Sequence, residues 1–112
     1  MNLLEETVQI LKENNKTLDD ILWIGTKDFT VDKKIALKIF GRTNYDSGFG
    51  AQEVAYDLLV VGAGWWLERE EYDGSEWWSY KEFPTVPRKE VNIKRVAGGM
   101  WDDLTTINEV TP

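Results

Sequence analysis

Two glutamates, Glu68 and Glu70, have the spacing that a pair of catalytic carboxylates needs. Side chains two apart on a β-strand point to the same face, so both carboxylates project together, with Glu82 facing one of them if the segment is a hairpin. Such a pair can act as general acid and base or bind a divalent metal ion. The chain holds 20 acidic residues in 112, so chance alone accounts for two on one strand face, and a solvated outer face is the favoured interpretation.

Composition excludes most other catalytic and metal-binding chemistry. The chain has no histidine and no cysteine, which removes imidazole and thiolate ligands, Ser-His-Asp triads and thiol nucleophiles. Residues 60–64, Val-Val-Gly-Ala-Gly, begin like a dinucleotide-binding motif, but Leu67 stands where the third glycine belongs. Asn44, Asp46 and Gly48 begin like a calcium loop, but the glycine comes one residue early. We therefore expect no cofactor, no bound metal and no catalytic residue.

Charge and hydropathy narrow the range of partners. The formal net charge is −7, whereas binding to nucleic-acid phosphates needs a basic surface, so direct nucleic-acid binding is not expected. Arg88, Lys89, Lys94 and Arg95, with Glu90 among them, form a modestly basic segment that we interpret as a solvated connection. The apolar runs are far shorter than the ~20 residues of a membrane span. The sequence thus predicts a cytoplasmic protein without membrane contact.

A tryptophan-rich hairpin over residues 65–83 is the clearest structural signal. Two aromatic-rich runs, 65–72 and 76–83, flank the turn residues Asp73, Gly74 and Ser75. Because neighbouring side chains on a strand point to opposite faces, each face of the hairpin receives tryptophans. One face of the hairpin must pack on a core, and the other face is the candidate binding surface.

The register of the hairpin decides which aromatic side chains share a face. A two-residue loop places Trp78 opposite Arg69, whereas a bulged loop with one more residue places Tyr80 opposite Glu68. The second face is either covered by helices and charged side chains or is an exposed aromatic patch bordered by carboxylates, as protein interfaces are. For the bulged register the predicted binding residues are Trp66, Glu68, Glu70, Tyr72, Trp78 and Tyr80, and in the two-residue register they redistribute.

The N-terminal half predicts helices and strands that would carry the hairpin. Asn2 and Glu5 predict the start of a helix over residues 3–14. Residues 21–25 and 57–61 are predicted strands. Residues 31–40 fit either a strand or a helix; the helix, with Thr30 as N-cap, is favoured. The predicted core stripe of the first helix is Leu3, Leu4, Val8 and Leu11.

The C-terminal extension carries weaker signals. Val91, Ile93 and Val96 alternate as in an edge strand, and residues 100–108 predict a short closing helix with Trp101 and Leu104 on one face.

Several stretches resemble small uncharacterised proteins encoded in phages and prophages of Gram-positive bacteria. These stretches are residues 43–50 (Thr-Asn-Tyr-Asp-Ser-Gly-Phe-Gly), 57–62 (Asp-Leu-Leu-Val-Val-Gly), 65–69 (Trp-Trp-Leu-Glu-Arg) and 71–78 (Glu-Tyr-Asp-Gly-Ser-Glu-Trp-Trp). The resemblance implies a small accessory protein that binds a host or phage component, and it implies no particular activity.

These patterns together predict a single α+β domain over residues 1–112, with a small, mainly antiparallel sheet packed by two to three helices. Its parts are an N-terminal helix within 1–15, the hairpin at 65–83 and a C-terminal extension at 84–112. The predicted function is non-catalytic interaction, through the acidic and aromatic hairpin face, with a protein partner or a second copy of the chain. The alternatives are an acidic nucleic-acid mimic that inhibits a host or phage protein, and a carboxylate-based hydrolase or sugar-binding module.

Overall fold

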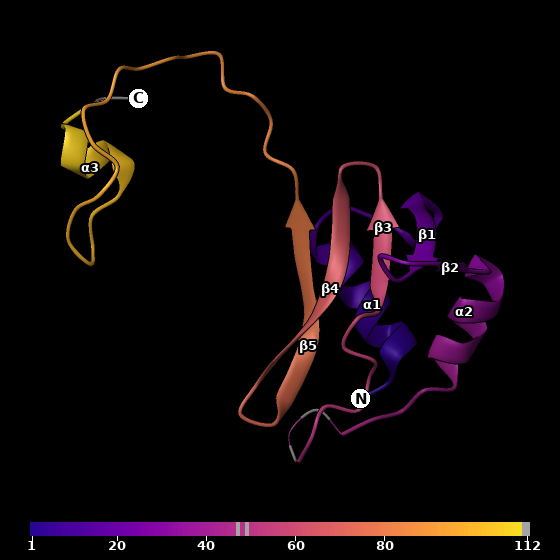
Figure 1. Ribbon diagram of the computed structural model, residues 1–112. Coiled ribbons are helices and arrows are strands. Elements are labelled where there is room, and N and C mark those ends of the chain that lie inside the picture. The colour runs from indigo at the N-terminus through magenta and orange to yellow at the C-terminus, as the bar shows by residue number, and fades with distance from the viewer. Residues whose placement is uncertain (47, 49, 111–112) are drawn as a thin grey trace.

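A computed structural model describes residues 1–46, 48 and 50–110 of the chain (Figure 1). Within this part, five antiparallel strands form one sheet in the order β2-β1-β3-β4-β5, accompanied by three α-helices, which confirms the predicted α+β class. The strands are β1 (Ile21–Gly25), β2 (Thr30–Val31), β3 (Leu59–Gly62), β4 (Trp65–Tyr72) and β5 (Ser75–Glu82), and the helices are α1 (Leu3–Glu13), α2 (Lys33–Gly41) and α3 (Leu104–Asn108), with a 3₁₀ turn at Leu18–Asp20.

Helix α1 begins where the sequence predicts, because the Asn2 side chain accepts a hydrogen bond from the Glu5 amide at 3.1 Å. Its buried stripe is Leu3, Thr7 and Leu11, four residues apart, so the prediction that Val8 faces the core is wrong. Thr7 is accommodated there because its hydroxyl donates to the Leu3 carbonyl oxygen at 2.7 Å, which is ordinary for a buried threonine in a helix.

The helix predicted over residues 31–40 is confirmed as α2, but its N-cap is Asp32, whose carboxylate accepts from the Ile35 amide at 2.9 Å. Thr30 is instead paired with Gly25 in the short strand β2, so its assignment as the cap is wrong. The second predicted strand starts two residues later than expected and runs through Gly62.

The hairpin has the two-residue loop, which settles its register. Trp78 lies opposite Arg69, and Leu67 lies opposite Tyr80. Asp73 and Gly74 both have positive φ, 50° and 86°, as a tight turn matched to the twist of the two strands requires. The bulged alternative, which pairs Glu68 with Tyr80, is therefore wrong.

One face of the sheet packs against α1 and α2 and forms the core (Figure 1). Trp65 and Leu67 of β4 and Trp78 of β5 point into it together with Val60 of β3. The Trp65 ring stacks on Tyr80, with centroids 5.8 Å apart, and lies over Gly62, where any side chain would collide with the indole.

Two charged residues, Arg69 and Glu76, are buried on this core face. The Arg69 guanidinium donates to Glu6 of α1 at 3.0 Å and to Glu76 of β5 at 2.6 Å, and the side chain of Arg69 is fully buried. Its Nε atom has no hydrogen-bond partner among the described residues. The guanidinium also lies 4.8 Å from the Trp78 ring, within cation–π range. Buried charges are tolerated only when paired in this way.

Each carboxylate of this cluster also accepts hydrogen bonds from backbone amides. Glu76 accepts from the amides of Glu53 and Val54, and although burial alone would raise its pKa, these bonds and the Arg69 guanidinium lower it. Glu6 accepts from the Trp78 amide at 2.9 Å and from the Tyr45 hydroxyl. Burial and the bond to Glu6 raise the pKa of Tyr45 to about 12. The cluster therefore ties α1, the segment around residues 45–54 and the hairpin together.

The C-terminal extension departs from prediction. No strand forms at residues 91–96, and the predicted closing helix shortens to α3, which stands away from the sheet with Trp101 exposed (Figure 1). Ser47 and Phe49 lie outside the described residues. Among the described residues, no helix is both long and apolar enough to cross a bilayer.

Candidate functional site

The candidate site is the sheet face opposite the helices, which we call the outer face. It comprises side chains that alternate with the core residues along β4 and β5 and the side chains level with them on β1 and β3. In Figure 1 both α1 and α2 lie on the other side of the sheet or beside it, and each residue of this face is partly or fully exposed. Its residues are Trp23, Leu59, Val61, Trp66, Glu68, Glu70, Trp77, Ser79, Lys81 and Phe83.

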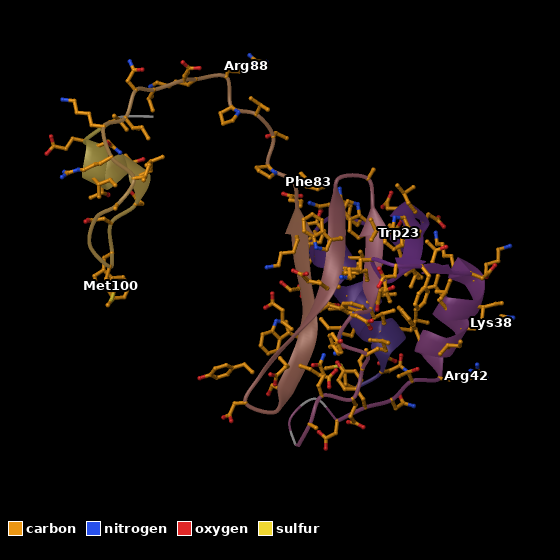
Figure 2. All side chains as sticks on the ribbon, in the orientation of Figure 1. Trp23, Lys38, Arg42, Phe83, Arg88 and Met100 are labelled. Carbon is orange, nitrogen blue, oxygen red and sulfur yellow. The ribbon has the colours of Figure 1, made fainter. Side chains whose placement is uncertain are left out.

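Aromatic and apolar side chains cross the outer face in a row. The strand register places Trp23 beside Val61, and Val61 beside Trp66. The row ends on Phe83, whose ring centroid lies 5.2 Å from that of Trp66 and which is itself 71% exposed. This position marks the end of β5, where the chain leaves the sheet (Figure 2). The row is a preformed apolar strip with one open end.

Charged side chains lie beside the aromatic row. The Lys81 ammonium is 3.2 Å from the Glu70 carboxylate and 3.8 Å from that of Glu68, and all three side chains are about two-fifths exposed. Ion pairs this exposed contribute little to stability, so they leave the carboxylates able to bind other cations. Beyond them, Trp77 lies opposite Glu70 and is 39% exposed.

Trp77 also borders a groove of about 420 Å³ between α1 and the edge strand β5. The groove is lined by Ile10 and by the carboxylates Glu5, Glu6 and Glu13. Acidic side chains therefore lie on both sides of the hairpin near its free edge. Glu6 covers part of this edge, because its carboxylate accepts a hydrogen bond from the Trp78 backbone amide. Without Glu6, that amide would be free to pair with another strand.

The outer face includes some of the predicted binding residues and not others. Trp66, Glu68 and Glu70 share it, and Tyr72 follows on the same side near the turn, 76% exposed. Trp78 points into the core, where it is 3% exposed and its indole nitrogen donates to Thr7 at 2.8 Å, so it cannot anchor a partner. Tyr80 lies on the core side too, stacked on Trp65.

In place of Trp78 and Tyr80, the outer face holds residues that the bulged register had placed on the core face. Trp77 and Lys81 of β5 lie on the outer face with Ser79, and Phe83, directly after the strand, joins them through its contact with Trp66. Alternation along β5, counted from the two-residue loop, is the signal that finds them.

The outer face brings aromatic side chains together with charges of both signs. The Lys81 ammonium lies 3.8 Å from the Glu68 carboxylate and 3.2 Å from that of Glu70, so it partly offsets their negative charge. Within the described part of the chain, no group of three or more acidic side chains is arranged to hold a metal ion. Aromatic side chains beside mixed charges are instead typical of protein interfaces. Compared with protein families, curated proteins and solved structures, the chain has no match.

Proposed function

We propose that this protein is a non-catalytic interaction module whose outer face binds a protein segment that is both basic and apolar. The observation that carries the proposal is the open strip of Trp66 and Phe83 next to the carboxylates of Glu68 and Glu70. Tryptophan is enriched among the residues that dominate binding energy, and carboxylates beside it select cationic partners.

Two features of the outer face favour this function over the alternatives. A nucleic-acid mimic needs an uninterrupted row of negative charge, whereas Lys81 divides the row formed by Glu68 and Glu70. A carboxylate hydrolase needs a cleft that excludes water, whereas these side chains lie on an open sheet face. The resemblance to phage proteins makes a host or phage protein the expected partner.

The test is affinity capture joined to site-specific crosslinking. A photoreactive amino acid at Ser79, in the middle of the outer face, should crosslink a partner from a Gram-positive host lysate, with or without phage infection. The same group at Lys38 on α2 is the control and should not. With the partner purified, Trp66→Ser should weaken binding at least about 30-fold, as loss of a dominant interface residue does.

A matched substitution shows whether the loss of affinity comes from Trp66 itself or from removing any exposed apolar side chain. Ile35→Ser removes an exposed apolar side chain from α2 and should leave the affinity unchanged. Equal crosslinking from Ser79 and Lys38, or equal losses for the two serine variants, would refute the outer face as the binding site.

A further inference from the structure

The C-terminal residues 84–110, which we call the arm, extend away from the folded body. The chain leaves β5 after Phe83 and runs outward past Arg88 to a far turn at Met100 (Figure 2). The radius of gyration is 18.4 Å, against about 13 Å expected for a compact chain of this length. The arm therefore accounts for the elongated shape, 52 Å along its longest axis.

The far end of the arm is folded on itself. The Asn108 side chain accepts from the amides of Lys94 and Arg95 at 2.8 and 3.1 Å and donates to the carbonyl oxygens of Arg95 and Leu104 at 2.9 Å. Ile107 is buried against Gly98. The tip so formed presents Met100, 87% exposed, and Trp101, 90% exposed. A local fold that holds these two side chains outward is organised for contact with another surface.

The rest of the arm is also apolar and open. Val86 and Val96 are among its most exposed side chains, and Val91 and Ile93 lie between them, each about two-fifths exposed. Apolar side chains gathered along one segment call for a partner surface more strongly than isolated ones do.

The distribution of charge indicates which surface the arm would bind. The arm as a whole is neutral, with four cationic and four acidic residues, but its cations all lie in residues 84–98, which carry one acidic side chain. Residues 1–83 carry 9 cationic and 16 acidic residues, a net charge of −7. The outer face combines the exposed rings of Trp77 and Phe83 and the half-buried ring of Trp66 with the carboxylates of Glu68 and Glu70. The arm thus has both the cations and the apolar side chains that the outer face would bind.

The exit of the arm favours contact with another molecule. Pro84 and Pro87 favour extended conformations at the residues before them, and residues 83–87 form neither helix nor strand. An exchange of arms between two copies lets each arm cover the partner's face, and such exchange is a low-cost way to form a symmetric dimer.

We infer that the arm of one copy lies across the outer face of a second copy, so that two chains dimerise by exchanging arms. This inference rests on the proposed function of the outer face as a protein-binding site and names its occupant. Cations such as Arg88 and Lys94 lie against Glu68 and Glu70 of the other copy, and the apolar side chains of the arm cover Trp66 and Phe83.

The test is the mass of the full-length protein by light scattering at concentrations from about 1 µM to about 1 mM, which cover moderate and weak association. Wild type should dimerise, more weakly at high salt. The face-reversed variant Glu68→Lys/Glu70→Lys and the arm-reversed variant Arg88→Glu/Lys94→Glu should each be monomeric. An equimolar mixture of the two should form a heterodimer, because both of its arm–face contacts then join opposite charges.

Two matched variants control for the change in charge. Asp19→Lys/Asp20→Lys and Lys34→Glu/Lys38→Glu make the same changes at exposed positions outside the outer face and the arm, and both should dimerise like wild type.

Three results would overturn the inference. These are a monomeric wild type at the highest concentration, an arm-reversed variant that still dimerises, and a mixture that stays monomeric. A monomeric wild type whose outer face still crosslinks a lysate protein through Ser79 would remove arm exchange alone and leave the proposed function standing. Dimerisation with no crosslink from Ser79, either to the second copy or to a lysate protein, would remove both, because the outer face would then not be the contact surface.

Discussion

Replacing Arg69 with methionine should destabilise the protein strongly. The substitution keeps an unbranched side chain of similar length but removes the cation that lies between Glu6 and Glu76. The Glu6 and Glu76 carboxylates then lie at the core without the Arg69 cation. Glu76 still accepts hydrogen bonds from the backbone amides of Glu53 and Val54. Lys81→Met is the matched control, because Lys81 also bridges two carboxylates of the same sheet, on its open face.

The expected magnitudes differ because of burial. Removing one partner of a buried ion pair costs about 3–5 kcal/mol, a large fraction of the ~5–15 kcal/mol by which domains are stable. Removing Lys81 should cost about 1 kcal/mol or less, since its side chain is 41% exposed and water screens its ion pairs. At a denaturant dependence of about 1.5 kcal/mol per molar, the urea midpoint of Arg69→Met should fall by about 2–3 M.

Urea unfolding followed by tryptophan fluorescence measures both variants. Repeating the urea unfolding at acidic pH tests the role of Glu76, whose pKa is lowered in the folded protein. In wild type its carboxylate stabilises the fold above its unfolded pKa of about 4.3, and that contribution is lost as the pH falls. Without Arg69 this loss should be smaller, so the two proteins should converge in acid. Equal costs for Arg69→Met and Lys81→Met, or a gap that widens in acid, would refute the reasoning.

Three further predictions concern the turn, the core tyrosine and the arm. Gly74→Ala should lower stability by about 1 kcal/mol in urea unfolding, because its φ of 86° disfavours a side chain. Stability should fall as the pH rises from about 10 to about 12, where the Tyr45 hydroxyl ionises in the fold, and Tyr45→Phe should show less of this loss. Asn108→Ala should speed amide exchange at Lys94 and Arg95 without shifting the unfolding of the sheet, since it removes their acceptor.

The elements defined by local signals were predictable from the sequence. The Asn2 cap and the helix at α2 follow from residues adjacent in the chain. The position of the hairpin turn at residues 73–75 follows in the same way, although the sequence leaves its loop length open between two registers. The buried cluster was not predictable in this way. It joins Glu6, Arg69 and Glu76 across as many as 70 positions, and nothing local marks Glu6 as different from the other acidic residues of the first helix.

The arm shows a different limit of sequence reasoning. Alternation at Val91 and Ile93 is typical of an edge strand, yet in one copy of the chain these side chains have no sheet to join. Periodicity reports which side chains seek an apolar surface and not whether that surface belongs to the same molecule.

Charge, rather than hydrophobicity, selects the register of the hairpin. Either register puts aromatic side chains on both faces, so burial of rings alone does not choose between them. In the observed pairing Arg69 shares the core face with Glu76, while Lys81 shares the outer face with Glu68 and Glu70. A shift of one residue along β5 would gather both cations on one face and all three of these carboxylates on the other, leaving one set of like charges in the core. The buried cluster therefore determines which tryptophans face outward, and with them the composition of the surface that we propose binds a partner.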